Sequence, residues 1–256
     1  MIRIIINGDD FGISREVNRA ITECFDKRIL TSTTLMVNMP YADEAVRLAK
    51  EQGFYESVGM HFNLTGGVPL TDNIKSMKRF CRKDGTFNAY FQKHTASRLK
   101  LTKEELACVA EEAEAQIRKY ISFGLPARHL DSHHHVHTNL PIWKILVPLL
   151  NKYDFRSVRL SRNLFKRTAP LNAIYKKYYN SGLKKSRFVT ADYFGSFKDL
   201  QKCRRMLKEN ILLELMLHPM YSEDGVLCDT KVPMSDVLGL LESIDAQRVG
   251  YSVYKG

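Results

Sequence analysis

Short runs of β-branched and apolar residues alternate along this chain with stretches of helical periodicity, and this alternation constrains the fold more than any other feature. Alternating strands and helices form a parallel sheet, because each helix carries the chain back to the starting edge of the sheet. The predicted strands are residues 2–7, 31–37, 58–64, 129–133, 156–160, 189–192, 211–217 and 249–254. Eight such strands predict an α/β fold of the (β/α) barrel type, TIM-like and either closed or imperfect, with mainly parallel strands.

Helix signals fall between these strands. Ser14 is placed to cap a helix that continues to about Lys27. Thr102 and Glu105 have the spacing of a capping box ahead of a strongly periodic helix, which Gly124 ends. Further helices are predicted at 40–53, 141–151 and 233–244.

No repeat, low-complexity tract or flexible linker divides the chain, so we expect one domain over residues 1–256. Residues 66–101 lack periodicity and are expected to make a long excursion over one rim of the sheet. No apolar stretch approaches the roughly 20 residues of a membrane span, and acidic residues follow the N-terminal strand before a signal peptide core could form. These features predict a cytoplasmic protein.

Basic residues are concentrated in one segment. Residues 152–210 contain 16 Lys and Arg but 4 Asp and Glu, a net charge of +12, so the rest of the chain contributes about −1 to the total of +11. A solvated, insertion-like face over residues 160–210 is the simplest interpretation, and an acidic substrate or a membrane surface are the alternatives. No nucleic-acid motif accompanies the charge, so no nucleic-acid partner is expected.

An acidic pair, Asp9 and Asp10, directly follows the first buried strand. Parallel α/β folds place their active sites at the C-terminal ends of the strands, so both carboxylates are predicted at that rim. Asp is also common in turns and caps, but two adjacent carboxylates after an Ile-rich strand favour a functional role. Adjacent side chains diverge, so one can bind a metal while the other faces an attacking water.

Five of the eight histidines lie within nine residues, from 129 to 137. Along an extended strand, alternate side chains share one face, here Asp131, His133, His135 and His137. A surface histidine tract is the alternative, but the internal position favours a metal site. Catalytic sites usually take three protein ligands, so the surplus histidines are expected to support the ligands or to face the substrate.

Three more residues are predicted to reach the same rim. His61 lies near the end of the third strand, Arg159 is in the fifth, and His218 ends the seventh, where Pro219 stops it. A lone histidine among apolar neighbours is more often a core residue, and Arg159 also fits as one more charge of the basic segment. A histidine at the end of a buried apolar strand needs a polar partner, which favours a role for His218 in the site.

The order and content of these motifs resemble the YdjC family, the ChbG/HpnK-type carbohydrate deacetylases. The matching segments are NGDDFG at 7–12, TSTT at 31–34, GMHFNLT at 59–65, HLDSHHHVH at 129–137 and HP at 218–219. The resemblance implies a (β/α)-barrel-like fold and a metal-dependent hydrolase that removes the acetyl group from an N-acetylated sugar, such as a chitooligosaccharide. Residues 66–100 match only loosely and residues 160–210 match nothing, so the identity of the sugar does not follow.

The resemblance also implies roles for single residues. Asp10, His61 and His133 would hold a divalent ion, Asp9 would be the general base, and His218 would be the general acid. Two imidazoles and a carboxylate suit Zn²⁺ by ligand softness, whereas family precedent includes Mg²⁺.

The remaining polar residues of the motifs are expected to bind substrate or to support the ligands: Asp131, His135, His137 and Arg159. Arg159 would orient Asp9 or contact the oxyanion. Two other functions stay open, a metal-dependent phosphoesterase whose basic segment recognises phosphate and a non-catalytic module that binds polyanions. A homodimer is the commonest assembly and is expected on that ground alone.

Overall fold

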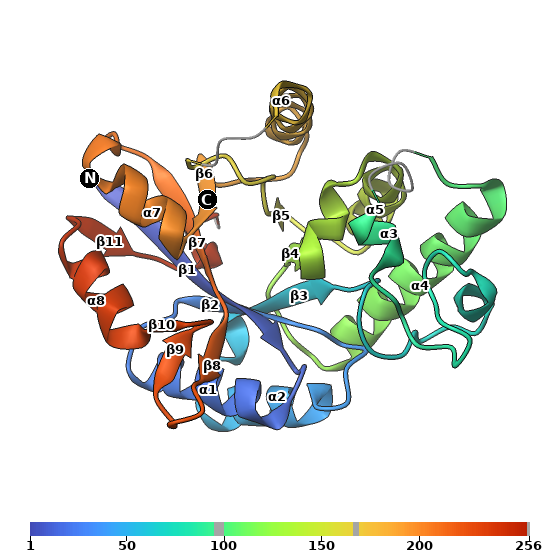
Figure 1. Cartoon of the computed structure of the whole chain (residues 1–256), viewed down its shortest axis with the longest axis horizontal. Coiled ribbons are helices and arrows are strands. Elements are labelled where there is room, and N and C mark those ends of the chain that lie inside the picture. Colours follow the sequence, from blue (N-terminus) through green and yellow to red (C-terminus); the bar gives the residue numbers. More distant parts are fainter. Residues whose placement is uncertain (95–99, 166–168, 255–256) are drawn as a thin grey trace.

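A computed structural model of the chain describes residues 1–94, 100–165 and 169–254, and a curled parallel sheet lies at its centre (Figure 1). The strand order is β5-β4-β3-β2-β1-β7-β6, and β11 pairs with the first residues of β1. The strands of this sheet are β1 (Ile2–Phe11), β2 (Ser32–Leu35), β3 (Val58–Phe62), β4 (His129–Ser132), β5 (Ser157–Val158), β6 (Tyr193–Ser196), β7 (Leu212–Leu217) and β11 (Ala246–Arg248). Each pair of neighbours is parallel, which confirms the predicted α/β fold as an open, half-barrel form.

Helices surround this sheet, and one of them, α6, lies at the outer edge of the molecule (Figure 1). They are α1 (Arg15–Asp26), α2 (Ala42–Glu51), α3 (Tyr90–Lys93), α4 (Lys103–Ser122), α5 (Leu140–Lys152), α6 (Pro170–Lys184), α7 (Phe197–Cys203) and α8 (Met234–Glu242). Short 3₁₀ segments are η1 (Tyr55–Ser57), η2 (Asn73–Ser76), η4 (His133–Thr138), η5 (Arg204–Met206) and η6 (Tyr251–Tyr254). A small antiparallel sheet contains β8 (Pro219–Tyr221), β9 (Leu227–Asp229) and β10 (Val232–Pro233). Among the described helices, none combines the length and apolarity that crossing a membrane requires.

The predicted helix caps are present. Ser14 Oγ accepts a hydrogen bond from the backbone N–H of Val17 at 3.2 Å. In the capping box of α4, the N–H of Glu105 donates to Thr102 Oγ1 and the N–H of Thr102 donates back to the Glu105 carboxylate, at 3.1 and 2.8 Å. Because these bonds satisfy N–H groups that a helix leaves free, they fix where each helix starts.

Two predicted strands lie elsewhere. The sixth strand begins at Tyr193 rather than within 189–192, and Val189 makes only an isolated bridge to Ser157. The prediction of a strand at 249–254 is wrong, because residues 246–248 pair with β1 and the chain then turns into η6. This turn lets the Tyr251 ring stack on the His129 ring, with centroids 3.8 Å apart.

The excursion over residues 66–101 has a small apolar core of its own within its described part. Phe80, Phe87 and Phe91 are buried, and the rings of Phe80 and Phe91 lie 4.9 Å apart. The Gln92 side chain donates to the backbone carbonyl of His134 at 2.6 Å. The excursion therefore supports the loop that carries the histidine motif.

Helix α4 ties together the two strands that bring histidines to the rim. The fully buried Tyr120 hydroxyl contacts the carbonyl of Val58, at the start of β3, and that of Ala127, just before β4, at 2.7 and 2.8 Å. One hydroxyl has a single proton but can interact with both carbonyls as a shared donor. Its loss leaves two carbonyls near the core with fewer partners.

We predict that Tyr120→Phe lowers the free energy of unfolding by about 1–3 kcal/mol, because the variant loses a buried hydroxyl that serves two carbonyls. Tyr55→Phe is the matched control, since the Tyr55 hydroxyl makes one long contact at the surface. Urea denaturation measures both. Equal stability of the two variants would show that Tyr120 does not hold the strands.

Candidate active site

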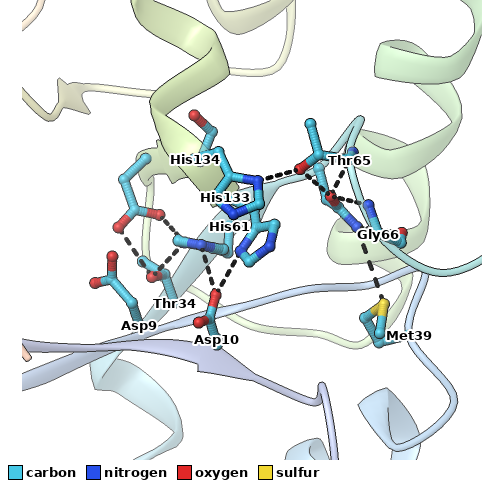
Figure 2. Close-up of polar contacts among 12 residues, drawn as sticks. Asp9, Asp10, Thr34, Met39, His61, Thr65, Gly66, His133 and His134 are labelled. Atoms are coloured by element: carbon cyan, nitrogen blue, oxygen red, sulfur yellow. Dashed lines mark hydrogen bonds and ion pairs between the residues drawn. The ribbon is translucent and has the colours of Figure 1, made fainter. Parts of the chain in front are cut away.

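An irregularity in β1 brings both acidic side chains into the site. The register between β1 and β2 shifts between Gly8 and Phe11, and Asp10 has a φ of 70°. Bulges re-aim side chains at strand ends, and Asp is among the few residues that tolerate left-handed φ values. As a result, the buried Asp9 turns into the protein interior while Asp10 faces two histidines (Figure 2).

Asp10, His61 and His133 form a compact set of ligand atoms, as predicted (Figure 2). Asp10 Oδ1 lies 3.1 Å from His61 Nε2 and 2.9 Å from His133 Nδ1. One ligand atom from each residue lies within 4.8 Å of the others. The three side chains come from the ends of β1 and β3 and from the first residue after β4, so the parallel sheet brings them together.

A second carboxylate fixes the ring of His61. His61 Nδ1 lies 2.6 Å from Asp131 Oδ1 and 3.1 Å from Thr34 Oγ1, while Nε2 points toward Asp10. Burial alone would lower the pKa of His61, but the charge of Asp131 and the bonds to both carboxylates raise it to about 10. Such a carboxylate–histidine pair is the arrangement that orients a metal-binding imidazole.

Arg159 lies at the centre of three carboxylates. Its Nη1 and Nη2 bind the two oxygens of Asp9 at 2.6 and 2.8 Å, and Nη1 also lies 2.6 Å from Asp131 Oδ2. Its Nε donates to Glu214 Oε1 at 2.5 Å. The guanidinium is fully buried and lies 4.7 Å from the ring centre of Phe194. Of the two roles predicted for Arg159, these contacts match the orientation of Asp9.

Glu214 and Tyr251 extend this network below the rim. Glu214 is fully buried in β7, and its burial raises its pKa, although the Arg159 charge and a bond from the Tyr251 hydroxyl act in the opposite direction. The C-terminal turn that carries Tyr251 is thereby linked to Arg159. Glu214 stands alone in an otherwise apolar strand, and this pattern could have indicated its role, since a buried charge requires a partner.

Both acids at the end of β1 are ionised. Burial alone would raise the pKa of Asp9, but the charge and hydrogen bonds of Arg159 lower it well below its usual range. The pKa of Asp10 is likewise well below its usual range, because hydrogen bonds from His133 and His61 outweigh burial.

The histidine motif does not continue as a strand, so the predicted shared face is wrong beyond Ser132. β4 ends there, and His134 and His135 both adopt left-handed backbone angles, with φ of 52° and 56°. These two residues reverse the chain into η4. As a result, His133 alone of its triplet joins the ligand set, and His135 packs edge-on to Phe194 with ring centroids 5.6 Å apart.

His137 is a buried structural residue in this loop. Its Nδ1 lies 2.5 Å from Ser132 Oγ, and its Nε2 lies 3.1 Å from the carbonyl of Arg159. Burial and the Arg159 charge lower its pKa to about 3, so the ring is neutral. Of the two roles expected for His137, substrate binding or support of the ligands, the buried position of its ring fits only support. Its bond to the Arg159 backbone ties the loop to the central arginine.

Sequence reasoning missed His134 because strand periodicity assigned it to the opposite face. Its ring lies beside that of His133, with centroids 4.0 Å apart, and its Nδ1 lies 3.1 Å from Thr65 Oγ1 (Figure 2). The residue is exposed. His134 is therefore placed at the mouth of the site.

His218 follows β7 directly, as predicted, and its backbone N–H donates to Asp229 Oδ1 at 2.8 Å. Its side chain is half-buried and makes no hydrogen bond within the described part of the chain. The charge of His218 contributes to the low pKa of Asp9, after the larger effects of burial and Arg159. The imidazole therefore lies within electrostatic range of Asp9.

The chemistry of the donor set fits a divalent cation. Three carboxylates, those of Asp9, Asp131 and Glu214, contact one guanidinium. Asp10 adds a fourth carboxylate, which faces His61 and His133, so the site has excess negative charge. Asp131 is occupied by His61 and Arg159, which leaves Asp10 as the carboxylate that faces outward. Two imidazole nitrogens and one carboxylate oxygen are a common three-ligand set with space for further ligands.

Known proteins resemble the chain over most of its length. The model of the family described as YdjC-like protein matches residues 3–248. A carbohydrate deacetylase from Clostridium beijerinckii is 32% identical over 88% of this chain and 84% of its own, and one from Geobacillus stearothermophilus is 34% identical over 85% and 79%. A crystal structure of an Enterococcus faecalis protein, suggested to cleave cellobiose phosphate, superimposes with a TM-score of 0.73 and 22% identity over 98% of each chain.

We predict that His133→Ala weakens the affinity for Zn²⁺ or Mg²⁺ by at least about 100-fold, because it removes one of three ligands. His134→Ala is the matched control, since the adjacent ring contacts Thr65 and should leave the affinity unchanged. Isothermal titration calorimetry measures both constants. Undiminished affinity in His133→Ala, or an equal loss in both variants, would contradict the ligand assignment.

Proposed function

This chain belongs to the YdjC-like protein family, and from that premise we propose that it is a carbohydrate deacetylase that hydrolyses the N-acetyl group of an amino sugar. The reaction consumes water, breaks the amide C–N bond and yields acetate and a free amine. The names of the relatives support the reaction class, since those that match over most of this chain are carbohydrate deacetylases.

One observation carries the proposal, the pairing of a three-ligand cation site with a separate carboxylate. Asp10, His61 and His133 are the ligand residues, and Asp9 lies beside them but is bound by Arg159. When bound, a divalent ion supplies Lewis-acid chemistry, since it polarises an amide carbonyl and makes water more acidic. We propose Zn²⁺ or Mg²⁺ as the ion, with Zn²⁺ favoured by the two imidazoles.

Asp9 is proposed as the general base. An ionised carboxylate has about four acceptor positions, two on each oxygen. Three are occupied, because Oδ1 accepts from Arg159 and Asn7 and Oδ2 accepts from Arg159. The remaining position on Oδ2 is available to take a proton from water during attack on the carbonyl. Arg159 contributes by fixing the direction of that position.

His218 is proposed as the general acid. The nitrogen of the departing sugar amine needs a proton when the C–N bond breaks, and an imidazole is suited to supply one near neutral pH. The side chain of His218 is half-buried and has no partner among the described residues, so it can turn to the substrate. Its backbone N–H donates a hydrogen bond to Asp229, which fixes the position of the main chain that carries the ring.

The substrate class is tested by measuring acetate release from N-acetylglucosamine and its oligomers, with a generic phosphomonoester as a second substrate. We predict acetate release that a chelator abolishes and that added Zn²⁺ or Mg²⁺ restores, because the ligand set fits a divalent ion. Metal-dependent phosphate release without any acetate would instead establish the phosphoesterase alternative.

We predict that Asp9→Asn lowers kcat by at least about 100-fold, because an amide cannot accept the proton. The affinity for the divalent ion should change little, since Asp9 is not a ligand in this assignment. Asp192→Asn is the control, since this carboxylate binds the backbone N–H of Leu212 at the opposite ends of the strands. Acetate release and calorimetry give the two quantities. Wild-type turnover in Asp9→Asn would remove Asp9 from the role of base.

A further inference from the structure

Helix α6 has apolar side chains on two opposite faces, and only one of these faces is covered. On the inner face, Tyr179 and Leu183 are buried, and the Tyr179 ring packs edge-on to Trp143 with centroids 5.6 Å apart. On the outer face, three large side chains are exposed: Leu171 by 82%, Ile174 by 66% and Tyr178 by 68%. A surface helix with an uncovered apolar face usually marks an interaction site.

The three exposed side chains form a single stripe. Positions i, i+3 and i+7 of a helix share one face, so Leu171, Ile174 and Tyr178 are neighbours along about two turns. Figure 1 shows α6 at the outer edge of the molecule, beyond the helices that cover the sheet. The stripe is therefore accessible to a large, flat partner.

Positive charge accompanies the stripe. Residues 170–191 contain four Lys and one Arg but no Asp or Glu. Lys177, Lys184 and Lys185 are exposed and form no ion pair within the described part of the chain. Lys177 and Lys184 are seven residues apart, so they form a row next to the apolar stripe.

We propose that α6 docks this chain on the surface of a membrane rich in anionic phospholipids. Interfacial helices combine a strip of Leu, Ile or aromatic side chains, which enters the boundary of the acyl chains, with lysines that contact anionic headgroups. Tyrosine suits this boundary, because its ring is apolar and its hydroxyl stays hydrated. Clusters of lysine add affinity for anionic lipids in proportion to their number.

The combination of positive charge and apolar side chains on α6 also argues against two other binding partners. A second copy of α6 would bring two basic helices together, and like charges oppose that contact. A nucleic acid would match the charge but leaves aliphatic side chains such as Leu171 and Ile174 without a partner, because its phosphates are polar. An anionic bilayer offers acyl chains to the apolar stripe and negatively charged headgroups to the lysines.

The inner face of α6 connects this surface to the histidine loop. The Tyr175 hydroxyl donates to the carbonyl of Thr138 at 2.5 Å, and the Tyr179 hydroxyl donates to the carbonyl of His137 at 3.3 Å. Both carbonyls belong to η4, which begins at His133. Docking would therefore hold the bilayer one helix away from the candidate active site. The proposal does not depend on which reaction that site performs.

The test is co-sedimentation of the full chain with vesicles of phosphatidylglycerol and phosphatidylcholine, and with vesicles of phosphatidylcholine alone. The chain should bind the anionic vesicles at least about tenfold more tightly than the neutral ones. Raising NaCl to about 1 M, where the Debye length is about 3 Å, should release most of the protein. Equal binding to both kinds of vesicle, or none to either, would overturn the proposal.

Two triple variants separate the contribution of the apolar stripe to vesicle binding from that of the lysines. Leu171→Gln/Ile174→Gln/Tyr178→Gln and Lys177→Gln/Lys184→Gln/Lys185→Gln should each weaken binding by at least about tenfold. Glutamine is a good helix former, so α6 should persist, and an unchanged thermal transition and circular dichroism spectrum verify this.

The matched controls remove the same kinds of side chain elsewhere on the surface. They are Tyr55→Gln/Met220→Gln/Val226→Gln for the stripe and Lys83→Gln/Lys103→Gln/Lys231→Gln for the charge. Both should bind the anionic vesicles like the wild type. Losses as large as those of the α6 variants would show that α6 is not the docking site.

Two other results would assign the face to a different occupant and overturn the proposal. One is a dimer in light scattering that the stripe variant dissociates, without vesicle binding by the wild type. The other is binding to poly(U) that the stripe variant retains, again without vesicle binding.

Discussion

A buried guanidinium holds the candidate site together. Arg159 binds Asp9 on β1, Asp131 on β4 and Glu214 on β7, so one side chain links three strands of the sheet. Removal of one partner from a buried ion pair typically costs about 3–5 kcal/mol, because the other charge is left without compensation. The strands that carry the site are therefore held in register by buried ion pairs as well as by the backbone hydrogen bonds of the sheet. The His137 ring also contacts the carbonyl of Arg159, so the loop that carries the histidines is tied to these three strands.

This arrangement gives the acidic residues separate tasks. Asp131 contacts both Arg159 and His61 Nδ1, so it turns His61 Nε2 toward Asp10. Asp9 receives two bonds from Arg159 and stays ionised next to the ligand set. Asp10 alone points outward to the histidines. The carboxylate proposed as a cation ligand and the one proposed as the base thus belong to adjacent residues, whose side chains the bulge in β1 directs apart.

The sequence could predict those parts of the site that depend on the sheet, because strand ends in a parallel fold share one rim. This reasoning placed Asp10, His61 and His133 together, and the family resemblance selected them as ligands. It could not predict the two left-handed residues after His133, since no glycine or proline marks that turn, and so it assigned His134 and His135 to the wrong places. The role of Tyr251 could not be predicted from the sequence, because it arises from contacts between distant segments.

We propose that Asp10, His61 and His133 hold one divalent ion while Arg159 keeps Asp9 out of the coordination sphere. A crystal structure of the Zn²⁺-loaded protein, with anomalous scattering recorded at the zinc edge, tests it most directly. We expect a single peak about 2.0–2.2 Å from an oxygen of Asp10, His61 Nε2 and a nitrogen of His133, with Arg159 still bound to Asp9. A peak coordinated by Asp9, or one away from these three side chains, would contradict it.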